Sequence, residues 1–163
     1  MSVFNYSRDV VMQSKIRIPL EKATAQSIFH QFYEAEKNKR WFAMPPFVFI
    51  DHKEENFQEG SKATLSFGMP PFSYDAVCVK CEPNKGIRAE LKGRLQGVLE
   101  FEIQKSNDDW ELRYTLKCRG STPFWHLYYF AGCYIPHGPY MKYRLNKLRN
   151  YAIEERGFYG EAD

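Results

Sequence analysis

The chain has 163 residues, of which 44% are apolar and 26% charged, a composition that suits one soluble globular domain spanning residues 1–163. Its net charge of +3 is too small to indicate a nucleic-acid-binding protein. No stretch approaches the roughly 18 apolar residues of a membrane span. Because Met1–Val11 also lacks the apolar run of a signal peptide, the four cysteines predict reduced thiols in the cytoplasm.

The first predicted element is a strand over Val10–Ile18, where apolar and polar residues alternate until Pro19 ends the ladder. Helical structure is expected from Leu20 to Phe42, because apolar residues recur there at spacings of three and four. Within it, the charged segment Glu34–Arg40 predicts a second short helix or a turn.

Short segments separated by turn residues follow, which is typical of an antiparallel meander. The six predicted strands cover Phe47–His52, Ser61–Phe67, Tyr74–Cys81, Ile87–Lys92, Leu95–Gln104 and Trp110–Cys118.

The last predicted element is a helix over Pro139–Arg156. Its apolar stripe consists of Met141, Leu145, Leu148 and Ala152. Pro136 and Pro139 are expected to kink or interrupt helical structure near its start, since proline lacks an N–H and clashes with the preceding turn.

These elements predict an α+β helix-grip fold, with a seven-stranded antiparallel sheet curled around the C-terminal helix and two short helices between strands 1 and 2. A long antiparallel sheet coils and becomes concave, and a rigid helix cannot fill that concavity along its whole length. The high aromatic content, 17% of the residues, also suits a cavity lined by large rings.

The order of elements resembles that of the START-like, or SRPBCC, superfamily. The resemblance lies in the strand ending at Ile18-Pro19-Leu20, the helix Glu21–Phe32, Trp41, and Glu59-Gly60 before the strand Ser61–Phe67, followed by the meander and final helix. The family includes lipid-transfer domains, polyketide cyclases, coenzyme-Q-binding proteins, plant pathogenesis-related proteins and chaperone activators. The resemblance implies an apolar ligand held between sheet and helix, and it carries over no catalytic residue.

Successive connections of a meander alternate between the two ends of the sheet. The segments Met44–Phe47 and Met69–Phe72, both Met-Pro-Pro-Phe, should therefore lie at one end, which in proteins of this type resembles the cavity mouth. We interpret Met44, Phe47, Met69 and Phe72 as an adaptable apolar gate, because methionine conforms to varied partners. The alternative is that they plug one end of the core.

Inward-facing positions supply the candidate ligand-binding residues, of which Ser14, Tyr74 and Tyr114 are polar and could bind a ligand oxygen, a neighbour or water. The full set is Met12, Ser14, Met44, Phe47, Phe49, Leu65, Phe67, Met69, Phe72, Tyr74, Leu99, Phe101, Trp110, Leu112, Tyr114, Trp125, Met141 and Leu145.

Candidates for acid–base chemistry are Tyr114, His126 and His137, the two histidines flanking the aromatic segment near the expected mouth. His52 is expected to be exposed. The pair Cys78 and Cys81 forms a CxxC, but residues three apart on a strand point to opposite faces, so no metal site is predicted. No motif for a cofactor occurs.

Three functions remain open. The leading one is a non-catalytic carrier or sensor of a small hydrophobic molecule such as a lipid, an isoprenoid or a polyketide. The second is a cyclase or dehydratase that uses the same cavity, and the third is a protein-interaction module with a filled interior and an exposed apolar patch. The expected partners include no nucleic acid and no membrane span, transient membrane contact is compatible with the sequence, and the oligomeric state is open.

Overall fold

Seven antiparallel strands form one curved sheet in the computed structural model, which describes residues 8–68 and 71–159, with side chains as far as residue 156. The strands are β1 Val10–Pro19, β2 Val48–His52, β3 Lys62–Phe67, β4 Phe72–Glu82, β5 Gly86–Gly93, β6 Leu95–Ser106 and β7 Asp109–Gly120. Their order across the sheet is β1-β7-β6-β5-β4-β3-β2. The predicted meander and its six strands are confirmed, and β1 joins it by pairing with β7.

Two short helices connect β1 and β2, namely α1 (Ala25–Tyr33) and α2 (Ala35–Phe42). The side chain of Thr24 begins α1 by accepting a hydrogen bond of 3.0 Å from the backbone N–H of Ser27, whose own hydroxyl oxygen accepts from the N–H of Thr24. The charged segment after Tyr33 forms α2, so it is a helix and not a turn.

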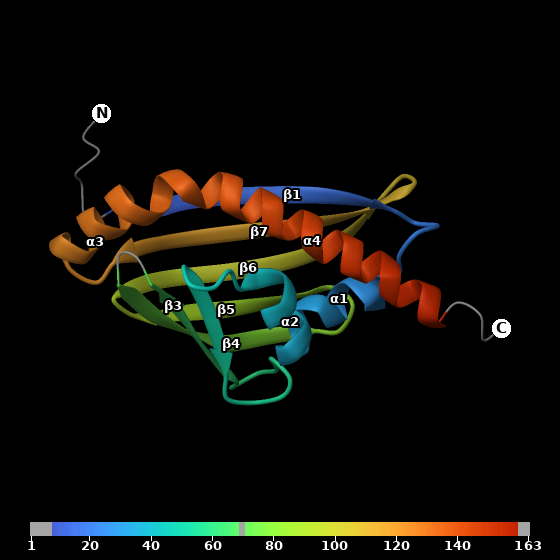
Figure 1. Ribbon diagram of the computed structural model, residues 1–163, viewed down its shortest axis with the longest axis horizontal. Coiled ribbons are helices and arrows are strands. Elements are labelled where there is room, and N and C mark those ends of the chain that lie inside the picture. The colour runs from blue at the N-terminus through green and yellow to red at the C-terminus, as the bar shows by residue number, and fades with distance from the viewer. Residues whose placement is uncertain (1–7, 69–70, 160–163) are drawn as a thin grey trace.

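A long helical arm closes the chain and lies along the concave side of the sheet (Figure 1). The arm consists of α3 (Pro123–Tyr129), the π-helical turn η1 (Phe130–Tyr134) and α4 (Ile135–Tyr159). Of the kink or interruption predicted at Pro136 and Pro139, the interruption does not occur, because α4 runs through both residues, and the kink stays a prediction. The π turn directly before them changes the register of the backbone hydrogen bonds, so that residues without an N–H can be accommodated beside it.

The inner stripe of α4 anchors the arm to the sheet. Met141, Leu145, Leu148 and Ala152 are all fully buried, as their spacing predicts. Figure 1 shows α1 and α2 beside the second half of α4, where both helices contact it. The core is therefore filled most completely at this end of the molecule, and less completely beneath η1 and the first turns of α4.

Two irregularities shape the sheet. Gly97 in β6 has φ +147°, and a Cβ there would lie 2.0 Å from the carbonyl oxygen of Lys117, so only glycine allows β6 and β7 to approach as they do. A bulge in β4 shifts the register with β5 between Cys78 and Lys80. Bulges increase the local bend and twist of a strand, which favours a concave inner face.

Candidate functional site

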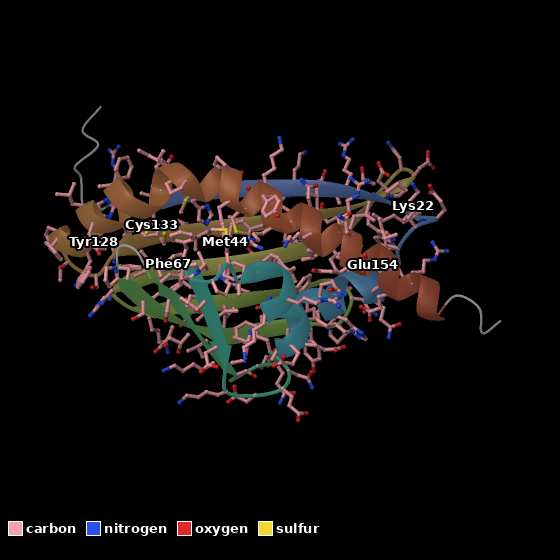
Figure 2. All side chains as sticks on the ribbon, viewed as in Figure 1. Lys22, Met44, Phe67, Tyr128, Cys133 and Glu154 are labelled. Carbon is pink, nitrogen blue, oxygen red and sulfur yellow. The ribbon has the colours of Figure 1, made fainter. Side chains whose placement is uncertain are left out.

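A cavity of about 280 Å³ lies between the sheet and the start of the helical arm. Its lining is almost entirely apolar and aromatic and comes from β2 to β7, α1, α2 and the arm. Only two of the lining residues, Phe47 and Pro136, are exposed, so the opening lies where the segment before β2 meets the first turn of α4. Figure 2 labels three of the lining residues, namely Cys133 on the arm, Phe67 on β3 and Met44 before β2.

Small side chains on three neighbouring strands create the space. Ala63 on β3, Ala76 on β4 and Ala89 on β5 all line the cavity, and Ala63 pairs directly with Ala76. Leucine or phenylalanine at these positions would fill the room that the alanines leave. None of these alanines was among the predicted site residues, although their small size at inward positions could have indicated an unfilled interior.

Nine of the predicted ligand-binding residues line this cavity. They are Met44, Phe47, Leu65, Phe67, Tyr74, Leu99, Phe101, Tyr114 and Met141.

The other described candidates lie outside the lining. They are Met12, Ser14, Phe49, Phe72, Trp110, Leu112, Trp125 and Leu145. Trp110 donates its indole N–H to the carbonyl of Ala23 (3.1 Å) and packs at the filled end of the core. Leu112 and Leu145 are fully buried in that end, and Met69 lies outside the described residues.

The connections before β2 and after β3 lie at the same end of the sheet, as predicted from the alternation of successive connections. The N–H of Gly68, directly after β3, donates to the carbonyl of Phe47 (2.8 Å), so the segments before β2 and after β3 lie side by side. Phe47 is 50% exposed at the opening. Phe72, by contrast, is buried and packs its ring against Tyr128 and Tyr129, so it belongs to the core beneath α3 and does not form part of the opening.

The prediction of which β2 side chains face the cavity is wrong for Phe49. Val48, Ile50 and His52 line the cavity, whereas Phe49 is exposed. Every residue from Phe47 to Ile50 is apolar, so the pattern could not distinguish the two faces, and a shift of one residue exchanges them. His52 is consequently half-buried, contrary to the prediction that it is exposed.

The lining contains two pairs of hydrogen-bonded polar side chains. The hydroxyl of Tyr114 and Nε2 of His137 are 3.0 Å apart, with the two rings stacked. Burial lowers the pKa of His137 to about 4 and raises the pKa of Tyr114 well above its usual value, so both groups are neutral at pH 7. At the β2 side, Nε2 of His52 lies 3.0 Å from Oδ1 of Asn38, and burial lowers the pKa of His52 as well.

Three further tyrosines line the cavity, and they differ in their partners. Tyr129 donates to Sδ of Met12 (3.7 Å), and Tyr140 donates to the carbonyl of Phe42. Tyr74 is only 7% exposed and lines the cavity, and its hydroxyl makes no side-chain hydrogen bond in the described part of the chain. Burial raises the pKa of Tyr74, so this hydroxyl keeps its proton and can donate it to a ligand oxygen.

His126 does not reach the cavity. It is buried beneath α3, and its Nδ1 accepts a hydrogen bond from the backbone N–H of Gly120 (3.3 Å). The structure therefore separates His126 from Tyr114 and His137, with which it was grouped.

The bulge in β4 changes the orientation expected for the CxxC pair. Cys78 pairs with Ala89 and Cys81 pairs with Ile87, and both partners belong to the inner face, so the two cysteines share a face and are not opposed. Burial raises the pKa of Cys78 to about 11, which keeps it a thiol. Among the described residues, no group of three or more His, Cys, Asp or Glu side chains could hold a metal ion.

None of the described helices has a stretch long and apolar enough to cross a lipid bilayer. No protein-family model and no curated protein matches the sequence.

Solved structures are similar in fold at low sequence identity. The Aha1 dimer from Colwellia psychrerythraea has a TM-score of 0.62 and 17% identity over 88% of this chain and 96% of its own. Protein CV1439 from Chromobacterium violaceum has a TM-score of 0.65 and 10% identity over 88% and 98%. Ara h 8.0201 has a TM-score of 0.59 and 7% identity over 90% and 99%. The chain therefore has a helix-grip fold.

Proposed function

We propose that the protein is a non-catalytic carrier or sensor that binds a compact, mainly apolar molecule in the cavity beneath η1 and the first turns of α4. The observation that carries the proposal is an apolar, aromatic-lined cavity with an opening at Phe47 and Pro136. Such sites usually combine an apolar wall with a few polar groups that orient the ligand. In this proposal the chain works as a single domain.

The dimensions favour a compact ligand. A volume of about 280 Å³ is close to the lower limit of the roughly 300–1,000 Å³ typical of small-molecule sites. A short isoprenoid, a small polyketide-like ring system or a short lipid suits this space better than a long acyl chain. Each buried methylene contributes about 0.8 kcal/mol, so ten such groups would give substantial affinity.

Tyr74 supplies the polar contact in this proposal. Because Tyr74 lines the cavity and its hydroxyl makes no hydrogen bond among the described residues, a ligand carbonyl or hydroxyl could accept a hydrogen bond from it. The four cysteines are free thiols, which suits the reducing cytoplasm.

The other two functions have less support. A general acid or base works best with a pKa near the operating pH. His137, with a pKa of about 4, and Tyr114, with a raised pKa, match neutral pH poorly as a catalytic pair. A protein-interaction module should have a filled interior, and the cavity argues against that.

Native mass spectrometry of the freshly purified protein, followed by titration with the neutral fluorescent probe N-phenyl-1-naphthylamine, tests the proposal. We expect a co-purified apolar mass or uptake of the probe. Ala89→Leu, which fills the lining, should weaken probe binding at least tenfold, whereas Glu90→Leu on the outer face of the same strand should leave it unchanged. Equal affinity of the two folded variants would contradict a ligand site in this cavity.

A further inference from the structure

An exposed apolar stripe runs along the outer side of the helical arm, opposite the face that covers the core. Its four residues, Phe124, Leu127, Ala131 and Ile135, are spaced by three, four and four positions and are all exposed. Phe124 is 64% exposed, Leu127 51% and Ile135 74%. We call these four residues the arm stripe. Exposed apolar residues that occur singly need no explanation, but a stripe on one helical face indicates a surface that another apolar phase covers.

The π turn keeps the stripe on one side of the arm. A π turn takes more residues per turn than the α-helix, so Ala131 and Ile135, four apart across η1, stay in line with the residues of α3. Two larger aromatic side chains, Trp125 and Tyr128, are half-buried beside the stripe. The combination of exposed Phe, Leu and Ile with flanking Trp and Tyr is typical of helices that lie in a membrane interface.

The charge of this part of the chain is strongly one-sided. Residues 112–153 contain seven of the 23 Lys and Arg residues and none of the 20 Asp and Glu residues, so this segment carries +7 and the rest of the chain −4. A small overall charge of +3 conceals this segregation. Not all of this charge lies at the surface, because Arg113 pairs with Glu102 and Glu111, Lys117 pairs with Asp9, and Arg144 is buried. The exposed cations that remain favour an anionic surface as the partner.

Three exposed cations near the arm stripe lack a carboxylate partner within the described residues. They are Arg94, Arg119 and Lys142. The guanidinium of Arg94 lies 4.4 Å from the ring centre of Trp125, which places it beside α3. Asp9, the carboxylate directly before β1, is paired with Lys117 (3.7 Å) and not with any of these three cations.

The stripe is also continuous with the opening of the cavity. Ile135 precedes Pro136, one of the two exposed lining residues, and the hydroxyl of Tyr128 donates to the carbonyl of Pro71 (3.1 Å), which ties α3 to the connection between β3 and β4. Figure 2 places Tyr128 toward the end of the arm that lies far from Glu154. A surface that covers the stripe would therefore meet the rim as well.

We propose that the arm stripe docks on the surface of an anionic lipid bilayer, with Phe124, Leu127 and Ile135 entering the interface and the flanking cations contacting lipid headgroups. The docking is peripheral, because the apolar face is short and one-sided. It stands independently of which molecule occupies the cavity.

Sedimentation of the full chain with phosphatidylcholine vesicles and with vesicles that contain one quarter phosphatidylglycerol tests the proposal. We expect at least tenfold tighter binding to the anionic vesicles and a loss of that preference in 0.5 M salt, because salt screens charges near the surface. The double variant Phe124→Ser/Leu127→Ser should weaken vesicle binding at least tenfold. Binding of N-phenyl-1-naphthylamine by this variant should be unchanged, which separates docking from misfolding and from the cavity.

The matched control is Val11→Ser/Val79→Ser, which removes two exposed apolar side chains from β1 and β4, and it should bind vesicles like the unaltered chain. Equal binding to neutral and anionic vesicles, or equal binding by the two double variants, would overturn the proposal. So would absence of vesicle binding together with a dimer that Phe124→Ser/Leu127→Ser abolishes, because the stripe would then be a protein contact.

Discussion

Replacing Ala76 by leucine adds three carbon atoms at a point where the sheet faces the cavity. Ala76 is buried, lines the cavity and pairs with Ala63, so two small side chains adjoin there. Each methylene-sized group placed in apolar surroundings contributes about 0.8 kcal/mol. If the groups enter empty space, the free energy of unfolding should therefore rise by up to about 2.4 kcal/mol, which corresponds to a rise in Tm of about 5–10 °C in a chain of this size.

The sign of the change is informative, because the same substitution in a filled part of the core has the opposite effect. Ala152, on the inner face of α4, is fully buried and does not line the cavity, so Ala152→Leu should cost about 1–3 kcal/mol through overpacking. Thermal and urea unfolding of both variants measure the difference. The reasoning is refuted if Ala76→Leu destabilises the protein as much as Ala152→Leu does, because the interior would then have no room.

Three further predictions concern the polar groups and the grip of the helix. Tyr74→Phe should change the free energy of unfolding by less than about 0.5 kcal/mol. Tyr114→Phe should lower it by about 1 kcal/mol, because this change removes the hydrogen bond to His137. Urea titrations of the two variants measure both free energies. The folded-state pKa of His137, about 4, lies below its ordinary value of 6.5, so the unfolded state binds the extra proton between these values. Stability should fall by up to about 3 kcal/mol as the pH drops from 6.5 to 4, and His137→Gln should flatten the measured pH profile. Leu145→Ala should cost about 2–5 kcal/mol in denaturant unfolding, and a loss below about 1 kcal/mol would contradict its place in the packed core.

The elements and their order could be predicted because each depends on a local pattern. Alternation in the meander and the spacing of Met141, Leu145 and Leu148 report which side of each element is apolar, and one apolar side requires burial. The connections at Phe47 and Gly68 could be placed at one end of the sheet because successive connections of a meander alternate between its two ends, which requires only the number of strands.

Predictions failed where the local pattern was ambiguous or where the backbone departed from regularity. The segment Phe47–Ile50 is apolar throughout, so the face of Phe49 was undetermined until β2 paired with β3. The bulge between Cys78 and Lys80 exchanges the faces of the β4 side chains that follow it, and no residue in β4 indicates a bulge at this point. Pro136 and Pro139 predicted a kink or an interruption, but the helix continues through them after the π turn η1, which no local pattern indicated.

Where apolar and polar residues alternate without a bulge, the sequence by itself determined which side chains point inward, and hence that Tyr74, Phe101 and Tyr114 belong to one apolar face of the sheet. Only the tertiary structure decided which inward residues meet empty space and which meet another side chain. Trp110 and Leu112 share a face with Tyr114, yet the end of the core in which they lie is filled. The physical reason is that orientation is a property of one strand, whereas an unfilled volume depends on how far the coiled sheet and the arm are held apart by all the side chains between them.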